Sequence, residues 1–151
     1  MTVVWEPEAA DSGDQRPFER VLSTLADLAP LRRHVRQTAT KLGLAQNRMQ
    51  DWVLAIDEAA TNAVVHGAGG HLRHYTALNV LICEISNRVG TIDVATSPTP
   101  PSTSQLNGRG MWLIQELCQR VDIRGGTIVL RINLPAAAPS KHHQPWPPGR
   151  G

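Results

Sequence analysis

No stretch of this sequence stays apolar for long enough to cross a membrane. A membrane-spanning helix needs about 18 or more predominantly apolar residues in a row, and every apolar run here is shorter. The N-terminus also lacks a basic segment followed by an apolar one, which is the pattern of a secretory signal peptide. These absences favour a cytoplasmic protein that does not act at a membrane.

Cysteine and net charge are scarce as well. Cys83 and Cys118 both lie inside apolar runs, so we expect buried thiols in a reducing compartment and no disulfide framework. A formal net charge of +2 is too small for the basic footprint of a nucleic-acid-binding protein. The 151 residues, 41% hydrophobic and 19% charged, are enough for one globular domain with a proper core.

The stretch from Val53 to Gly67 is the most informative part of the chain. At about 100° per residue, its apolar and polar side chains fall on opposite sides of one helix, which we expect to begin near residue 46. Glu58, Asn62 and His66 follow one another four residues apart on the polar side. A solvated helix face normally carries Lys, Arg and several Glu, so this polar face is unusual.

That polar face suits a proton acceptor beside a cation. Glu58 and Asn62 are one turn apart, about 6 Å along the helix axis. A carboxylate can accept a proton there, while a neutral amide oxygen ligates a hard cation. Ala55 and Ala59 leave room on this face for a ligand. An ordinary core helix with scattered polar residues fits the same pattern, and this stretch alone does not separate the two interpretations.

The rest of the chain predicts two further helices and five strands. Apolar residues at helical spacing predict one helix from Leu28 to Leu42 and another over 111–121, after Gly110. Runs rich in β-branched residues predict strands, with Asn87 to Gly90 as a hairpin turn between the second and third. The expected strands are 18–22, 76–85, 91–95, 121–124 and 127–134.

Three segments indicate irregular structure. Residues 1–16 are polar and acidic, and we expect a loose arm, in which Val3, Val4 and Trp5 could form a short edge strand. Residues 96–107 contain three prolines and no apolar pattern, which is typical of a lid or a binding loop. Residues 135–151 are Pro-rich and basic, as in a disordered tail. The ordered domain is therefore expected over residues 17–134.

Two groups of charged or titratable residues allow more than one interpretation. The helix over 28–42 has a basic outer face, which is either solvated or a docking surface for an acidic protein: Arg32, Arg33, Arg36 and Lys41. Residues 67–74 (GAGGHLRH) indicate a turn, and His66, His71 and His74 near it have a spacing that metal ligands could have. No cysteine or carboxylate completes a tetrahedral zinc set, so we interpret them as polar loop histidines.

The order of these parts resembles a known family. The string E-A-A-T-N-A-V-V-H-G at 58–67 is followed by strands, a long loop, G-R-G at 108–110 and a final G-T strand at 126–127. This is similar to the histidine-kinase-like ATPase fold, the Bergerat or GHKL class, and most similar to bacterial anti-sigma-factor serine kinases. Over residues 18–134 the resemblance implies an α+β two-layer sandwich: about three helices on one face of a mostly antiparallel five-stranded sheet, with ATP between the layers.

The resemblance also implies roles for the positions that match. Glu58 matches the acidic residue that accepts a proton or orients the nucleophile. Asn62 matches the amide whose oxygen ligates Mg²⁺. Gly108 and Gly110 match the glycines whose backbone lies close against the phosphates. Thr127 matches the threonine near the adenine. We therefore expect Glu58 to be catalytic and the other four residues to bind Mg-ATP.

One segment departs from the family pattern. After the strand over 91–95, the family carries D-x-G-x-G, whose aspartate accepts a hydrogen bond from the adenine amino group. The matching residues here are T-S-P-T-P, from Thr96 to Pro100. Thr96 offers an uncharged hydroxyl, and prolines cannot copy a glycine backbone that approaches a ligand closely. Thr96 is still the residue expected at the adenine, and His66 and Arg109, inside the matching strings, complete the expected cofactor-binding set.

The resemblance implies a regulatory protein kinase. Such a protein binds a sigma factor and uses Mg-ATP to phosphorylate a Ser or Thr of a small anti-sigma antagonist protein. Members of the family often act as dimers, so a homodimer is implied as well. A function of another class remains open: a non-catalytic binding module that keeps the fold and the partner surface but has weak or lost ATP binding.

Overall fold

The computed structural model describes residues 16–92 and 106–135 of the chain. Three α-helices occur in these residues, preceded by a short 3₁₀ helix at Leu25–Asp27: α1 (Leu28–Lys41), α2 (Gln46–Val65) and α3 (Leu106–Leu117). Five strands accompany them: β1 (Phe18–Leu22), β2 (Gly70–Ala77), β3 (Val80–Asn87), β4 (Arg120–Arg124) and β5 (Thr127–Asn133).

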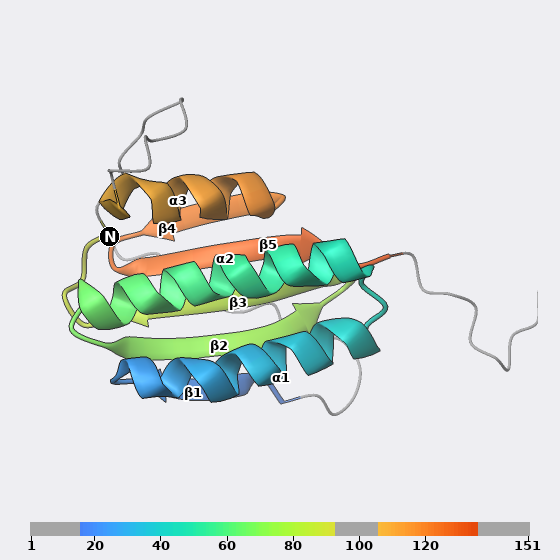
Figure 1. Cartoon of the computed structure of the whole chain (residues 1–151), viewed down its shortest axis with the longest axis horizontal. Coiled ribbons are helices and arrows are strands. Elements are labelled where there is room, and N and C mark those ends of the chain that lie inside the picture. The colour runs from blue at the N-terminus through green and yellow to red at the C-terminus, as the bar shows by residue number, and fades with distance from the viewer. Residues whose placement is uncertain (1–15, 93–105, 136–151) are drawn as a thin grey trace, which may run out of the picture.

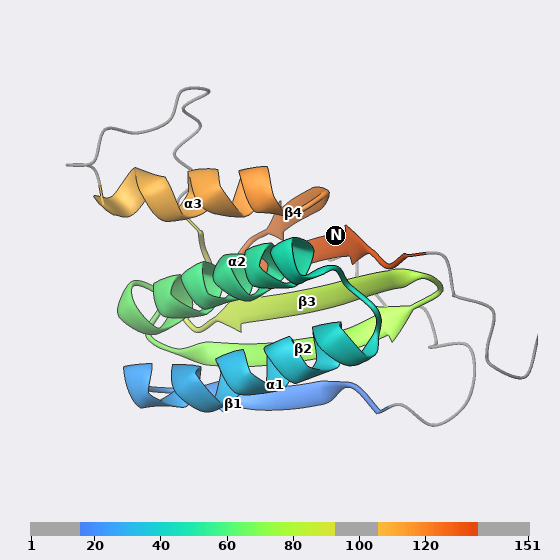
Figure 2. The same ribbon diagram turned by 45° about the vertical axis from the view of Figure 1, so that its right-hand side comes forward.

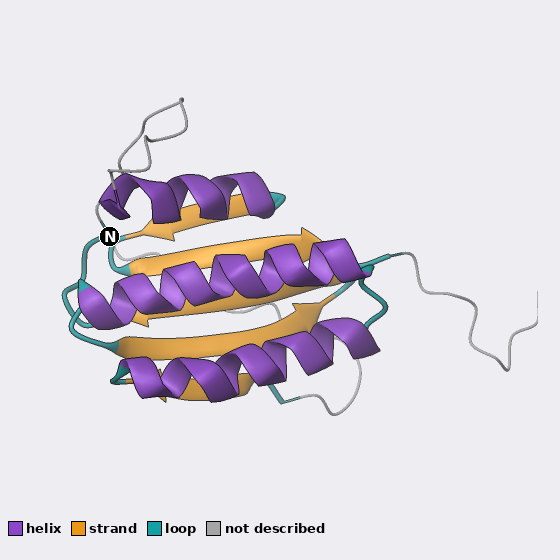
Figure 3. Cartoon of the chain, in the orientation of Figure 1, coloured by secondary structure: helices purple, strands orange, loops and turns teal. Residues whose placement is uncertain are grey.

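The strands form one antiparallel sheet, and the helices cover one of its faces. The strand order is β1-β2-β3-β5-β4, and each neighbouring pair is antiparallel. Figure 1 shows α1, α2 and α3 lying side by side on the same side of the sheet, and Figure 3 separates the two layers by colour. The expected α+β two-layer sandwich is therefore confirmed.

Alternate side chains of the strands point toward the helices and form the core between the two layers. In β3, Leu81, Cys83 and Ile85 are buried toward the helices, because successive side chains of a strand point to opposite faces. From α2, Trp52 and Ile56 are buried against them. At about 25 cal/mol for each Å² of apolar surface removed from water, side chains of this size supply most of the stabilisation of such a domain.

Local signals fix where α1 begins and ends. The carboxylate of Asp27 accepts hydrogen bonds from the backbone N–H groups of Thr24 (3.0 Å) and Ser23 (2.9 Å), which lower the pKa of Asp27. These bonds cap the 3₁₀ helix that leads directly into α1. Pro30 lies in the first turn of α1, where its missing N–H costs nothing. The helix ends at Lys41, and Gly43 then takes a φ of +85°, which a glycine adopts without strain.

The predicted boundaries of the second and third strands were wrong. The turn falls at residues 78–79, inside the expected strand 76–85. Of the Gly- and His-rich turn expected at 67–74, only residues 67–69 are irregular, and residues 70–74 belong to β2. Leu78 takes a φ of +52°, a conformation that sequence patterns associate with Gly or Asn. Gly70 is required for strand pairing and not for a turn, because a Cβ at Gly70 would lie 1.8 Å from the carbonyl oxygen of Ser86.

Two further expectations need correction. Thr91 and Ile92 are not in a strand, and residues 93–95 lie outside the described residues, so β2 takes the place of the strand expected at 91–95. The last helix begins at Leu106 and not after Gly110, and it ends at Leu117, because Val121 already belongs to β4. The strands expected at 18–22, 121–124 and 127–134 are confirmed to within one residue.

The two cysteines are free and buried, as their apolar neighbours predict. Burial raises the pKa of Cys118 to about 12, and it raises the pKa of the fully enclosed Cys83 as well. Both therefore stay as neutral thiols and act as small apolar core residues. Within residues 16–92 and 106–135, no helix has the length and apolar character to cross a membrane.

Candidate functional site

A pocket of about 320 Å³ opens at one end of the sandwich. The last turns of α2, the end of β3, the start of β5 and the first half of α3 meet at this end, as Figure 2 shows. Its apolar walls come from all of these elements and from the segment after β3: Ala59, Ala63, Ile85, Val89, Ile92, Met111, Ile114 and Ile128. Its polar lining residues are Asn62, His66, Asn87 and Thr91.

Helix α2 supplies the polar edge of the pocket. Asn62 is half-buried and His66 is exposed, and both line the pocket, one turn apart. The backbone N–H of His66 donates to the carbonyl of Asn62 at 2.9 Å, which closes the last turn of the helix. Glu58 lies one turn before Asn62 and is half-buried, but it is not among the described residues that line the pocket.

The small residues of α2 have two different roles. Ala55 is fully buried in the core, so the room beside it is filled by protein and not by a ligand, contrary to the expectation from the sequence. Ala59 is only 4% exposed and lines the pocket together with Ala63. The space for a ligand therefore lies along the last two turns of α2, and helix α3 packs against the same helix.

Asn87 organises the side of the pocket that follows β3. Its side-chain amide donates to the carbonyl of Thr91, and its side-chain oxygen accepts from the N–H of Gly90, both at 2.8 Å. Its backbone N–H donates to the carbonyl of Gly126, also at 2.8 Å. The first two bonds close the turn that follows β3, and the third holds this turn against the turn between β4 and β5.

Glycines allow this packing around Asn87. A Cβ at Gly67 would lie 2.5 Å from the Cβ of Asn87, and a Cβ at Gly126 would lie 2.5 Å from its side-chain oxygen. Sequence reasoning assigned Asn87 only to a turn and missed that it lines the pocket. The signal was present, since Asn followed three residues later by Gly is typical of a side chain that bonds to its own turn.

The other expected site residues lie at the same end of the fold. Gly108, Arg109 and Gly110 are in the first turns of α3, directly before the pocket residue Met111. The first N–H groups of a helix have no helical acceptor and attract anions, so this end of α3 suits a phosphate. Thr96 lies outside the described residues.

Thr127 is close to the pocket without lining it. It is the first residue of β5 and pairs with Ser86, while its neighbours Gly126 and Ile128 both line the pocket. Side chains alternate along a strand, so Thr127 points to the sheet face opposite to Ile128. Contact between Thr127 and a ligand in this pocket would therefore involve its backbone.

The described lining residues fit a nucleotide in part. A flat, apolar group such as a purine matches the isoleucine and methionine walls, and pockets for small ligands are commonly apolar with a few convergent polar groups. The amide oxygen of Asn62 is a hard-cation ligand, which together with phosphate oxygens and water suits Mg²⁺. None of the described lining residues is Asp, Glu, Lys or Arg. The expected phosphate contacts would therefore have to come from the N–H groups at the start of α3.

Comparison with known proteins agrees with this fold and pocket. A family model of the histidine kinase-like ATPase domain matches residues 21–133, most of the chain. The chain therefore belongs to the histidine kinase-like ATPase family. Membership of this family implies that the domain binds ATP, typically together with Mg²⁺. A search of curated proteins gave no match.

Proposed function

We propose that this protein is an anti-sigma-type regulatory kinase. It binds a sigma factor, and it uses Mg-ATP to phosphorylate a Ser or Thr of an anti-sigma antagonist protein. One observation carries the proposal: Asn62 lines an apolar pocket of nucleotide type, one helical turn after Glu58, in a chain of the histidine kinase-like ATPase family. The anti-sigma assignment rests on the resemblance of residues 58–67 and 108–110 to that group of kinases.

The two polar residues of α2 divide the chemistry between them. Asn62 would hold Mg²⁺ through its amide oxygen, and the metal would supply positive charge that offsets the charge of the phosphates. Glu58 accepts the proton of the Ser or Thr hydroxyl, whose oxygen forms the new bond to the γ-phosphorus as the bond to the β-phosphate oxygen breaks. The products are ADP and the phosphorylated antagonist.

Helix α1 offers a surface for an acidic partner. Arg33, Arg36 and Lys41 are exposed along it, whereas Arg32 is held by Asp57 of α2 at 2.7 Å. The pair fixes α1 against α2, and none of the ion pairs among the described residues involves the other three cations. Surface charges of one sign mainly raise association rates and select partners, so this face fits recognition of an acidic protein.

One feature of the sequence favours a second function. Thr96 to Pro100 replace the family's aspartate and glycines, which removes a charged acceptor and introduces two prolines. Hydrogen bonds to charged groups contribute about 1.5–3 kcal/mol and neutral ones about 1, so ATP affinity falls by roughly three- to thirtyfold from this change. A non-catalytic binding module of the same fold is the function that such a loss favours.

Calorimetry with nucleotides separates the two functions. The kinase proposal expects the protein to bind Mg-ATP more tightly than Mg-GTP, and to bind ATP less tightly when EDTA removes the metal. Radioactive phosphate from [γ-³²P]ATP should then pass to a Ser or Thr of the antagonist that forms a complex with the protein. Absence of Mg-ATP binding would contradict the kinase proposal, and binding without transfer would favour the non-catalytic module.

A further inference from the structure

The outer side of α2, which faces away from the sheet, carries exposed apolar side chains. Leu54 is 41% exposed and Val65 is 54% exposed. At about 100° per residue, both lie within about 40° of Glu58 around the helix axis, and the residues that α2 buries lie on its opposite side. We call Leu54, Glu58 and Val65 the outer stripe. It runs along the middle of the helical layer, because α2 lies between α1 and α3 (Figure 1).

The two apolar residues of the outer stripe flank Glu58 at distances that an extended peptide matches. Leu54 precedes Glu58 by about 6 Å along the helix axis, and Val65 follows it by about 10 Å. Two or three residues of an extended chain cover the same distances, at about 3.3 Å for each residue. A segment that places a hydroxyl at Glu58 therefore brings side chains two or three positions away, on both sides, over Leu54 and Val65.

Helix α1 adds a cation beside the first end of the outer stripe. Arg32 of α1 pairs with Asp57 of α2 at 2.7 Å. The two helices run in opposite directions, as the colours in Figure 1 show, and a helix rises by about 6 Å over four residues. Arg36, one turn after Arg32, is therefore about level with Leu54, and it is exposed. Its guanidinium suits a carboxylate that approaches this end of the stripe.

The other end of the outer stripe is apolar on both sides. Leu25 precedes α1 by three residues, so the opposite directions of α1 and α2 place it near the last turn of α2, where Val65 lies. Leu25 is 57% exposed. Single exposed apolar side chains are normal on a protein surface, but these two come from different elements and lie at the same end of the stripe. The surface thus offers apolar contacts at both ends, a cation at one end and Glu58 between them.

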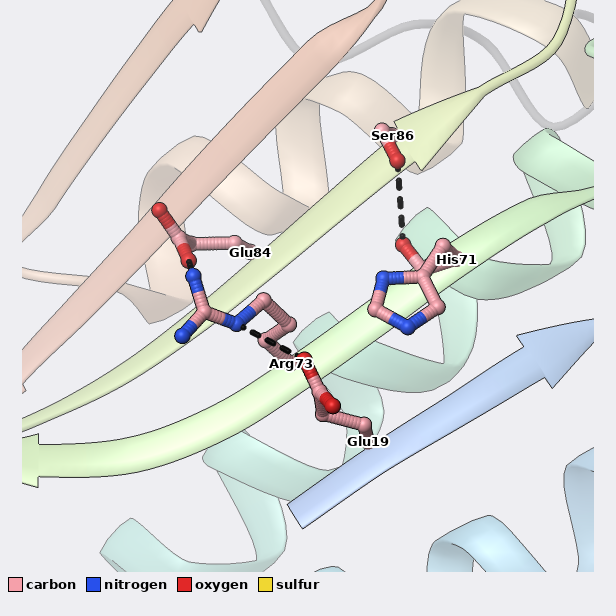
Figure 4. Close-up of polar contacts among 5 residues, drawn as sticks. All are labelled: Glu19, His71, Arg73, Glu84 and Ser86. Atoms are coloured by element: carbon pink, nitrogen blue, oxygen red, sulfur yellow. Dashed lines mark hydrogen bonds and ion pairs between the residues drawn. The ribbon is translucent and has the colours of Figure 1, made fainter. Parts of the chain in front are cut away.

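The opposite face of the sheet is a less suitable surface for a substrate. Charged side chains on that face are paired within the chain: Figure 4 shows Arg73 between Glu19 and Glu84, at N–O distances of 3.2 Å and 3.5 Å. The sheet also separates that face from Glu58, since α2 lies on the other side (Figure 2). A substrate that delivers a hydroxyl to Glu58 must therefore approach the helical layer.

We propose that the outer stripe docks the acceptor segment of the antagonist, an extended segment with apolar residues two or three positions before and after its Ser or Thr and with a nearby Asp or Glu. This inference rests on the proposed function, in which Glu58 accepts the hydroxyl proton. Apolar contacts with Leu54 and Val65 hold the segment on both sides of the hydroxyl, and the carboxylate meets Arg36. The surface therefore selects apolar, acidic sequences around the phosphorylated residue and disfavours basic ones.

The docked segment and the nucleotide use different residues of α2. Asn62 lines the nucleotide pocket, whereas neither Leu54 nor Val65 is among its described lining residues. The acceptor segment therefore docks on the outside of the helical layer, and the nucleotide enters from the end of the sandwich. Loss of the docking contacts should raise the KM for the acceptor and leave the affinity for Mg-ATP unchanged.

Binding of a labelled peptide to the full chain tests the docking without any requirement for catalysis. The probe is a short fluorescein-labelled peptide with a central Ser, Leu at two and three positions on both sides, and Glu at both ends. Fluorescence anisotropy should show that it binds at least about tenfold more tightly than a twin in which Gln replaces every Leu. A twin in which Lys replaces every Glu should also bind more weakly. Equal affinity for the probe and either twin would overturn the proposal.

Variants of the outer stripe locate the binding site of the probe. Leu54→Asp and Val65→Asp should each weaken probe binding at least about tenfold. Leu78→Asp is the matched control, because Leu78 is 78% exposed in the hairpin between β2 and β3, and Asp tolerates its positive φ. Unchanged binding in both stripe variants with native far-UV circular dichroism, or an equal loss in the control, would overturn the proposal. Leu54→Gln and Val65→Thr give the same comparison if an Asp variant does not fold.

Phosphate transfer separates this inference from the proposed function. Incubation with [γ-³²P]ATP should label the Ser of the probe, with a KM for the peptide that rises in Leu54→Asp and Val65→Asp while the Kd for Mg-ATP stays at the wild-type value. Binding without transfer would contradict the kinase proposal and retain the docking surface. Sedimentation equilibrium tests the other occupant: a wild-type dimer that becomes monomeric in the stripe variants would identify a contact between two copies and overturn the proposal.

Discussion

The indole N–H of Trp52 in α2 donates a hydrogen bond of 3.1 Å to Nε2 of His74 in β2, inside the core. The two residues are 0% and 3% exposed. Because Nε2 accepts this bond, the imidazole is neutral and carries its proton on Nδ1, which has no hydrogen-bond partner. Burial, with a smaller contribution from the nearby His34, lowers the pKa of His74 to about 3.

This relationship predicts that acid destabilises the fold through His74. The unfolded chain binds a proton at His74 near pH 6.5, and the folded chain does so only near pH 3. The contribution of His74 to the free energy of unfolding is therefore fully present above pH 6.5. It decreases by about 1.4 kcal/mol for each pH unit as the pH falls toward 3. Urea unfolding between pH 7 and pH 4.5 measures this slope.

His74→Gln is the variant that tests the assignment. Glutamine offers an oxygen to the Trp52 N–H but does not titrate, so the slope with pH should be shallower than in the wild type. His71→Gln, on the same strand, is the matched control and should keep the wild-type slope. A His74→Gln protein with an unchanged slope would show that other groups cause the acid sensitivity.

A second prediction concerns Asn62, which lines the pocket on α2. If its amide oxygen ligates Mg²⁺, Asn62→Ala should weaken Mg-ATP binding by at least about tenfold and abolish the effect of EDTA. The thermal midpoint should change little, because Asn62 is only half-buried. Thr61→Ala, one residue away and outside the pocket lining, is the control. Unfolding of Asn62→Ala would instead identify a structural role.

A third prediction separates catalysis from binding at Glu58. The isosteric Glu58→Gln removes the proton acceptor, so phosphate transfer to the antagonist should fall by roughly 10²-fold or more. ATP affinity should change little, because Glu58 is not among the described pocket-lining residues. Single-turnover transfer and calorimetry measure the two quantities separately. Equal transfer rates in the variant and the wild type would remove Glu58 from the mechanism.

The last prediction restores the family's missing carboxylate. If Thr96 meets the adenine amino group, Thr96→Asp should strengthen ATP binding by about 1 kcal/mol, roughly fivefold, less the cost of desolvating the new charge. The gain should be absent for GTP, since guanine has a carbonyl where adenine has its amino group. Ser97→Asp is the control for added charge. An equal gain in affinity for GTP, or a gain from Ser97→Asp, would show that Thr96 does not contact the adenine amino group.

Local patterns in the sequence determined most of the layout. The period of apolar residues defined α1 and α2, because a helix that buries one face must repeat every 3.6 residues. The strands β1, β4 and β5 were likewise predicted from local sequence to within one residue. The string around Glu58 and Asn62, followed in order by G-R-G and the final G-T strand, indicated the histidine kinase-like ATPase family, which the comparison confirms.

Tertiary structure decided what local patterns cannot encode. The hairpin between β2 and β3 turns at Leu78, which carries no turn signal, because pairing along both strands outweighs the cost of its positive φ. Ala55 and Ala59 look alike in the sequence, yet one is enclosed by core side chains and the other faces the pocket. Asn87 lines that pocket only because Gly67 and Gly126, distant in sequence, come close enough to exclude any Cβ.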